Sequence, residues 1–254
     1  MFDLRRFVWI FLSFTVVALG VAYVIYDQHM PPEATVTAAD APINPILMDT
    51  TLHHGIDISY HSGTVDWPTV KAQGFRFAFL KATEGDDLKD STFASHWRQV
   101  KQAGLLRGAY HFYVTEDDPD TQAAFFMRNV TLEPGDLAPV VDIELIGHHT
   151  PKDSLAQRFQ RFLSVIESHY GVKPIIYTTA KFWDEHFPGQ FGDYPLWVAE
   201  YDVDVPRIPN GWDAWHLWQW QGDTLITGIE KGADITRINR DELELTDLIV
   251  GGEG

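Results

Sequence analysis

From Gly55 onward the sequence alternates between short apolar segments and longer amphipathic ones, and this alternation restricts the possible folds more than any other feature. The clearest amphipathic segment is 154–170, in which Leu155, Phe159 and Ile166 recur at helical spacing on one stripe. Strands that alternate with helices predict a sheet of parallel strands with the helices covering it. The chain is therefore expected to form an α/β fold.

Eight segments are short, apolar and bounded by turn residues, as strands are, and five have the spacing of helices. The predicted strands are 55–59, 75–81, 108–112, 137–145, 174–178, 196–201, 215–220 and 233–235. The predicted helices are 67–73, 91–103, 120–130, 154–170 and 181–187. We therefore predict an irregular TIM-like β/α barrel with about eight strands and an incomplete helical ring. The alternative is an open doubly wound sheet, but the glycine-rich phosphate loop expected after its first strand is missing.

The N-terminal residues have the composition of a membrane segment. Two arginines precede an apolar run, 7–26, which is about as long as a bilayer-spanning helix requires, whereas the apolar part of a cleavable signal peptide usually has roughly 7–15 residues. We therefore expect a transmembrane signal anchor at 7–26, with residues 1–6 in the cytoplasm and the rest of the chain in the periplasm or outside the cell. The alternative is cleavage after Gly20 or Ala22, which would give a secreted protein.

Three further boundaries follow from composition. Residues 27–51 contain four prolines among Ala, Thr and Glu, and we expect an extended linker there. Residues 52–247 are expected to form the barrel domain, which is large enough for a substantial core. Residues 248–254 are expected to be a flexible tail. We expect the protein to act as a monomer.

The net charge and the lack of cysteine exclude several classes of function. With 36 acidic against 19 basic residues, the formal net charge is -17, so nucleic acid and anionic membrane surfaces should repel the chain. No basic patch is visible, and we expect no nucleic-acid partner. The chain contains no cysteine, which excludes disulfides, thiolate metal sites and cysteine nucleophiles.

Two carboxylates interrupt the apolar run of the predicted strand 137–145. Residues i and i+2 of a strand point to the same face, so Asp142 and Glu144 would lie side by side, roughly 6–7 Å apart along the strand. Like charges at that distance raise the pKa of at least one of the two acids. A fold tolerates such a pair more readily when the pair does chemistry. The alternative is that the strand ends at Val141 and both acids are solvated.

Further carboxylates fall where a barrel places its active groups, which is at the C-terminal ends of strands. Asp57 lies near the end of the first predicted strand, and Asp234 lies in the last. If parallel neighbours close the barrel, these two acids and the pair Asp142 and Glu144 converge on one mouth. Taken singly, Asp57 and Asp234 could each be a cap or turn residue.

Aromatic side chains cluster near the same strand ends, and aromatic rings beside carboxylates suit the C–H faces of a sugar. Two of them, Trp218 and Trp220, share a strand face opposite Gln219, so either the pair or Gln219 faces the barrel interior. The others are Tyr110, Tyr177, Trp197 and Tyr201. Paired acids in an aromatic cleft indicate glycoside hydrolysis.

Nine short motifs in order along the chain make residues 55 to about 238 resemble glycoside hydrolase family 25, the lysozymes of the Chalaropsis type. The motifs are Gly55-Ile56-Asp57-Ile58-Ser59, Val65-Asp66-Trp67, Lys81-Ala82-Thr83-Glu84-Gly85, Gly108-Ala109-Tyr110-His111-Phe112, Val141-Asp142-Ile143-Glu144, Ile176-Tyr177-Thr178, Trp197-Val198-Ala199, Trp218-Gln219-Trp220 and Ala233-Asp234-Ile235. The resemblance implies an irregular β/α barrel that cleaves the β-1,4 bond between N-acetylmuramic acid and N-acetylglucosamine in peptidoglycan glycan strands, with retention of configuration.

The resemblance also implies roles for individual residues, and it implies neither a cofactor nor a metal. Glu144 matches the catalytic acid/base. Asp142 matches its partner carboxylate, which acts as nucleophile or as orienter of the substrate acetamido group, and whose charge helps to keep the proton on Glu144. Asp57 and Asp234 match the two remaining acids. Four residues match cleft positions of the family, Tyr110, Tyr177, Trp197 and Gln219, and we expect Tyr201 of the aromatic cluster to bind substrate with them.

The sequence departs from the family at two places, and both affect substrate subsites. Tyr60, His61 and Ser62 precede Gly63, where the family usually has an aromatic residue and a Gln, and Glu200 stands where an Asp or His is commoner.

Two other functions are compatible with parts of the sequence. One is a non-catalytic peptidoglycan-binding module on the same fold. The other is a metal-dependent hydrolase that uses His53-His54 and His148-His149, but adjacent side chains of an extended chain point apart and chelate poorly. We expect His111, which faces away from Tyr110, to be structural.

Overall fold

The structure is a computed structural model that describes residues 53–251. The predicted cytoplasmic N-terminus 1–6, signal anchor 7–26 and linker 27–51 lie outside the described residues. No helix between residues 53 and 251 is both long enough and apolar enough to cross a bilayer.

The described chain contains all eight predicted strands and all five predicted helices, and one strand that was not predicted, β3. The strands are β1 (His54–Ile58), β2 (Phe77–Glu84), β3 (Leu88–Lys89), β4 (Leu106–Phe112), β5 (Val140–Asp142), β6 (Ile175–Thr179), β7 (Leu196–Ala199), β8 (Leu217–Thr224) and β9 (Ala233–Ile238). The helices are α2 (Trp67–Ala72), α3 (Phe93–Gln102), α4 (Pro119–Asn129), α5 (Leu155–Tyr170) and α6 (Ala180–His186). Three short 3-10 helices are η2 (Tyr60–Ser62), η3 (Lys152–Ser154) and η4 (Leu245–Leu248).

The helices begin and end where the sequence supplies caps. The Asp118 side chain accepts a hydrogen bond from the Thr121 backbone N–H at the start of α4. Gly171 ends α5 in the left-handed conformation, with φ of 70°, which glycine adopts without a Cβ clash.

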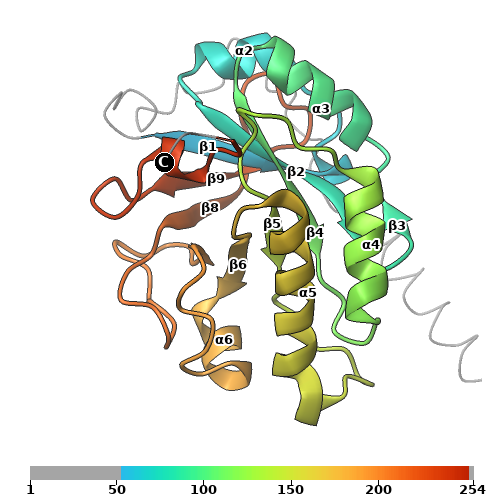
Figure 1. Cartoon of the computed structure of the whole chain (residues 1–254). Helices are drawn as coiled ribbons and strands as arrows, with labels where there is room; N and C mark the ends of the chain where they lie inside the picture. The colour runs from blue at the N-terminus through green and yellow to red at the C-terminus, as the bar shows by residue number, and fades with distance from the viewer. Residues whose placement is uncertain (1–52, 252–254) are drawn as a thin grey trace, which may run out of the picture. The chain divides into compact units, whose positions relative to one another are not determined.

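The strands close into a barrel because β1 pairs with both β2 and β9. The order around the wall is β1, β9, β8, β7, β6, β5, β4 and β2, and β3 extends β2 as a short hairpin partner. Helices α3 and α4 lie beside β2 and β4, and α5 packs against α4 (Figure 1). No α-helix of the described chain follows β7, so the predicted incomplete helical ring is confirmed.

One strand runs against the predicted direction. The barrel was expected to close with parallel neighbours, but β9 is antiparallel to both β8 and β1. The reason is the connection, because only residues 225–232 join β8 to β9, whereas a parallel crossover needs a dozen or more residues. The N-terminal end of β9 therefore lies at the same edge as the C-terminal ends of the other strands, and Asp234 pairs in register with Asp57.

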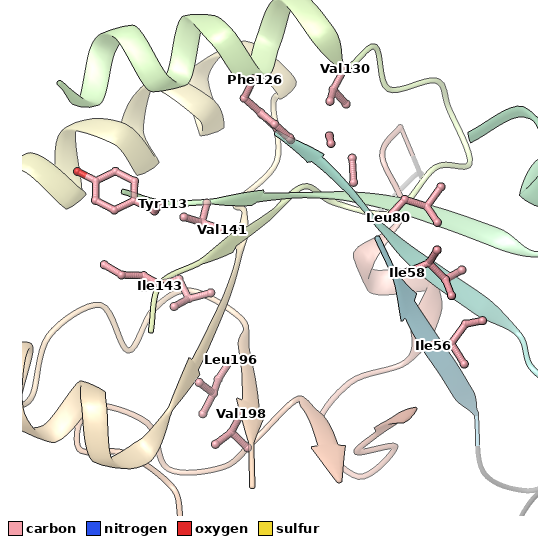
Figure 2. Packing of buried hydrophobic residues seen from close by; sticks show 14 of the residues in the cluster. Ile56, Ile58, Leu80, Tyr113, Phe126, Val130, Val141, Ile143, Leu196 and Val198 are labelled. Carbon is pink, nitrogen blue, oxygen red and sulfur yellow. The ribbon is translucent and has the colours of Figure 1, made fainter. Parts of the chain in front are cut away.

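The core has two layers, one on each side of the barrel wall. In the outer layer, Ile56, Leu80 and Val141 point outward from three strands and pack with helix side chains such as Phe126 of α4 (Figure 2). The inner layer fills the lower part of the barrel, and its members include Phe77, Phe79, Val140, Leu217 and Ile238. The inner layer forms the floor on which the functional side chains lie.

Two glycines make room for the inner aromatic rings. Phe77 lies opposite Gly55, and Phe79 lies opposite Gly108 on neighbouring strands. A Cβ on Gly55 would lie 2.1 Å from the Phe77 ring, and one on Gly108 would lie 2.4 Å from the Phe79 ring. Both motif glycines are therefore required by packing below the site.

The chain remains packed beyond residue 247, where a flexible tail was expected to begin. Leu248 is buried, its carbonyl accepts a hydrogen bond of 2.7 Å from the Ala138 N–H, and the Val250 N–H donates to the Asp136 carbonyl. These contacts join the end of the chain to the start of β5 and close the lower end of the barrel, so the packed domain extends at least to Val250.

Candidate active site

A cavity of about 210 Å³ opens at the C-terminal ends of the barrel strands. All four carboxylates selected from the sequence line it, together with most of the predicted cleft residues. The lining residues are Asp57, Ser59, His61, Lys81, Tyr110, Phe112, Val140, Asp142, Glu144, Tyr177, Trp197, Gln219 and Asp234.

Asp142 and Glu144 both face this cavity, although β5 ends between them at Asp142. The extended conformation continues because the Ile143 N–H donates to the Tyr177 carbonyl at 3.0 Å and the Thr178 hydroxyl donates to the Ile143 carbonyl at 2.8 Å. Alternation therefore persists for two residues beyond the strand. Asp142 is only 8% exposed, which excludes the alternative in which both acids are solvated.

Gln219 organises the opposite wall of the cavity. Its Nε2 donates to Asp57 Oδ2 at 2.8 Å and to Asp234 Oδ2 at 3.2 Å, and its Oε1 accepts from the Tyr177 hydroxyl at 2.8 Å. The Tyr201 hydroxyl donates to the same Oε1. One buried amide thus fixes two carboxylates from β1 and β9 and two tyrosines from β6 and the loop after β7.

The orientation of β8, which the sequence left open between two possibilities, follows from this network. Gln219 faces the interior, whereas Trp218 belongs to the outer layer. The guanidinium of Arg237 lies 4.0 Å from the Trp218 ring centroid and 5.9 Å from that of Trp220. These two tryptophans are therefore structural residues of the barrel exterior.

The predicted cleft aromatics occupy different depths. Trp197 is 2% exposed and packs against Phe79 at 4.8 Å and against Tyr177 at 4.9 Å between ring centroids. It forms part of the floor. Tyr201 is 43% exposed, so it lies at the rim and offers its ring to solvent.

Burial raises the pKa of all four carboxylates, and repulsion by another of the four adds to the effect at Asp57, Asp142 and Glu144. Burial raises the pKa of Asp142 well above its usual range, and the charge of Glu144 adds to the effect. Burial and then the charge of Asp234 do the same for the pKa of Asp57. Burial is also the main cause of the raised pKa of Glu144 and of Asp234.

The neighbour that raises the pKa of Glu144 further is Asp234, across the mouth. The sequence assigned this effect to Asp142. The charge of Glu144 in turn raises the pKa of Asp142, so the two acids of β5 and its extension do not act on one another alone: Asp234 adds its charge from the antiparallel strand. A carboxylic acid that keeps its proton toward neutral pH is suited to donate it.

Five other lining residues had no assigned role in the sequence analysis. They are Ser59, His61, Lys81, Phe112 and Val140. Lys81 could have been found by strand alternation, because it shares the inward face of β2 with Phe77 and Phe79. His61 lies in η2, within one of the two segments that depart from the family pattern.

The histidines do not form the metal site considered above. His53-His54 lies at the start of β1 and His148-His149 follows β5, so the pairs are at opposite ends of the barrel. Within residues 53–251, no three His, Asp or Glu side chains have an arrangement that could hold a metal ion. His111 contacts the Thr83 hydroxyl at 2.8 Å and Gln122 at 3.2 Å, and burial lowers its pKa to about 3. It is a neutral structural residue, as expected.

Comparison with known proteins identifies the family of this chain. The sequence profile described as Glycosyl hydrolases family 25 matches residues 56–229, which include Asp57, Asp142 and Glu144. The chain belongs to this family. The match ends before β9, so Asp234 is placed at the site by the structure.

Relatives of this family 25 member include proteins with and without a known role. The chain is 36% identical over 203 residues to the uncharacterized protein YegX of Escherichia coli (strain K12). This alignment covers 78% of this chain and 74% of YegX. It is 30% identical over 207 residues to Lysozyme M1 of Streptomyces globisporus, and this alignment covers 75% of this chain and 69% of that protein.

Solved structures of family 25 proteins share the barrel. A bacterial lysozyme from Streptomyces coelicolor superposes with a TM-score of 0.73 at 27% identity, covering 79% of this chain and 98% of that one. A family GH25 lysozyme from Aspergillus fumigatus gives a TM-score of 0.70 at 30% identity, covering 80% and 100%. The predicted irregular barrel and the predicted enzyme class, a glycosidase of the lysozyme type, are confirmed.

Proposed function

We propose that this family 25 lysozyme hydrolyses the β-1,4 bond between N-acetylmuramic acid and N-acetylglucosamine in peptidoglycan, with retention of configuration, and that the cavity with four carboxylates is its active site. The observation that carries the proposal is the convergence of Asp57, Asp142, Glu144 and Asp234 on one cavity. A binding module that does no chemistry gains nothing from four crowded acids, because their burial destabilises the fold.

In this proposal Glu144 is the acid/base. Its raised pKa favours the protonated form that a general acid needs, and it is half-buried past the end of β5 in the lining of the cavity, where a glycosidic oxygen can reach it. It donates its proton to the leaving oxygen as the bond to the anomeric carbon breaks. It then takes a proton from the water that completes hydrolysis.

Asp142 acts from the deeper position. One route makes it the nucleophile, which forms a covalent glycosyl-enzyme that water then opens. In the other route the substrate acetamido oxygen attacks the anomeric carbon, and Asp142 orients the acetamido N–H. Both routes retain configuration, and both need Asp142 as an anion. Its Oδ1 is buried without a hydrogen-bond partner from the described residues, so this oxygen has hydrogen-bonding capacity that the described residues do not use.

The products of wild-type protein test the function. Digestion of purified peptidoglycan should release muropeptides that carry reducing N-acetylmuramic acid, identified by mass spectrometry after borohydride reduction. NMR of the first products should show the β-anomer. Reducing N-acetylglucosamine ends would contradict the proposed bond, an initial α-anomer would contradict retention, and binding to insoluble peptidoglycan without any product would favour the binding module.

We propose that the catalytic domain lies outside the cytoplasm, anchored by the apolar run 7–26, and that it acts as a monomer. Fractionation of cells that express the full chain should recover it in the membrane fraction, with the catalytic domain accessible to protease from the outer face. Recovery of a soluble protein that lacks its first residues would show cleavage instead.

A further inference from the structure

The cavity with four acids contains one fixed positive charge. Among the described residues that line it, Lys81 is the only lysine or arginine. Its side chain is 12% exposed, and its Nζ donates to Glu84 Oε2 at 2.6 Å. The same Nζ lies 5.2 Å from the centroid of the Phe112 ring. An ammonium held between a carboxylate and an aromatic face has little freedom to leave the cavity.

A break in the register of the barrel wall creates this pair. Between Lys81 and Thr83 the pairing of β2 with β4 shifts by one residue, so that Lys81 lies opposite Tyr110 and Thr83 lies opposite His111. Strict alternation would put Lys81 and Glu84 on opposite faces. The bulge at Ala82 instead sends both Ala82 and Thr83 into the outer layer, where Thr83 contacts His111.

The consequence is that Glu84 returns to the inner face and reaches Lys81. Bulges are common beside active sites, where they redirect a side chain. Here the redirected side chain is the anchor of a lysine. Lys81 already lies in a cavity lined by four carboxylates, so it does not need the bulge to have acids near it. What the register shift adds is a further partner, Glu84, which is not one of those four carboxylates.

We propose that the Lys81–Glu84 pair is a positioning device for the reaction, in which the ammonium of Lys81 favours the ionised form of Asp142 in the cavity that both line, and Glu84 holds the ammonium in place. This inference rests on the proposed function of the cavity. It adds a residue that acts through Asp142 and assigns a role to the bulge of β2.

The electrostatic surroundings of Asp142 make such a device necessary. The charged groups that act on Asp142 are Asp57 on β1, Lys81 and Glu84 on β2, and Glu144 after β5. The charge of Asp142 in turn raises the pKa of Tyr110 on β4 and of Tyr177 on β6. Burial and the charges of Glu144, Asp57 and Glu84 all raise the pKa of Asp142, and Lys81 is the group that lowers it. Lys81 also lowers the pKa of Glu144, so both reacting acids depend on it.

The test is a direct titration of Asp142 in the full chain, by ¹³C NMR of its carboxyl carbon, with the signal assigned by its loss in Asp142→Asn. Lys81→Met should raise the pKa of Asp142 by about one unit, which is a tenfold change in proton affinity. Lys81→Arg, which keeps the charge, should leave the pKa near its wild-type value. Lys89→Met, an exposed lysine of the neighbouring β3, should have no effect.

The pH dependence of peptidoglycan hydrolysis gives the second readout. In Lys81→Met the acidic limb of kcat/KM should move upward by the same amount, so that activity falls about tenfold on that limb, and Lys81→Arg should restore it. If Lys81→Met does not fold, Lys81→Gln replaces it, because its amide can still donate to Glu84 without carrying a charge. An unchanged titration of Asp142 in the neutral variant would overturn the positioning role, whatever the wild-type activity. A shifted titration in a protein that cleaves no peptidoglycan would instead refute the proposed function.

Discussion

Replacing Glu144 by Gln is expected to lower the rate of peptidoglycan hydrolysis by about 10²–10⁴-fold, the range that a positioned general acid contributes. The glutamine side chain has nearly the same shape but holds no transferable proton, so the leaving sugar must depart as an unprotonated alkoxide. Glu144 lies past the end of β5 and is partly exposed. The substitution therefore leaves the barrel wall unchanged, and release of reducing ends from purified peptidoglycan measures the effect.

The matched control is Glu185→Gln, which makes the same change on an exposed side chain of α6. It should retain wild-type activity. Glu144→Gln should still sediment with insoluble peptidoglycan, because the floor and the Gln219 network remain. Full activity in Glu144→Gln would remove it from the acid/base role, whereas loss of sedimentation together with activity would show that its contribution is to binding.

The position of Asp234 shows what the sequence could and could not predict about the fold. The alternation of segments, with the apolar stripe of 154–170 as its clearest helix, predicted an α/β barrel and all the strands of its wall, but not the short strand β3 that extends β2. The direction of β9 was missed because the predicted strand 215–220 leaves residues 221–232 free, which is long enough for a parallel crossover. In the structure β8 continues to Thr224, and the remaining connection 225–232 is too short for one. Asp234 still reached the mouth, since reversing the strand moved its N-terminal end there.

The side-chain network of the site was less predictable than its acids. Acids that interrupt an apolar run stand out in a sequence. By contrast, the sequence could not show whether Gln219 or the pair Trp218 and Trp220 faces the barrel interior. That depends on which face of β8 is turned inward when the barrel closes. Lys81 and Glu84 share a face only because of a bulge that breaks the period of two, and no pattern based on that period can reveal it.

Replacing Asp142 by Asn is expected to have two opposite effects: a loss of activity of at least about 10²-fold and a gain in stability at neutral pH. The activity falls because the amide is neither a nucleophile nor an anion at the anomeric carbon. The stability rises because burial and the charge of Glu144 make the ionised Asp142 unfavourable in the folded protein. An active-site group that destabilises the fold on which it acts is a common trade-off between stability and activity.

The gain in stability of Asp142→Asn should depend on pH in a defined direction. The folded pKa of Asp142 lies well above its ordinary value of 3.8, so folded protein holds the proton more tightly than unfolded protein does. Stability from this group is complete below pH 3.8 and is lost as the pH rises through the folded pKa. Asparagine does not titrate and has no such loss, so the Tm of Asp142→Asn should exceed that of wild type by a margin that grows with pH. Each kcal/mol of difference in the free energy of unfolding corresponds to roughly 2–4 °C in Tm for a domain of this size.

Thermal unfolding measured between pH 4 and pH 8 shows whether the ionised Asp142 destabilises or stabilises the folded protein. Asp213→Asn, an exposed acid outside the cavity, is the control and should follow wild type at every pH. A Tm of Asp142→Asn below that of wild type at pH 7 would mean that the ionised carboxylate stabilises the resting barrel. The attraction between Asp142 and Lys81 would then outweigh burial and repulsion together. Inactive but more stable protein at pH 7, with the two Tm values converging at pH 4, is the result that the crowding of buried acids predicts.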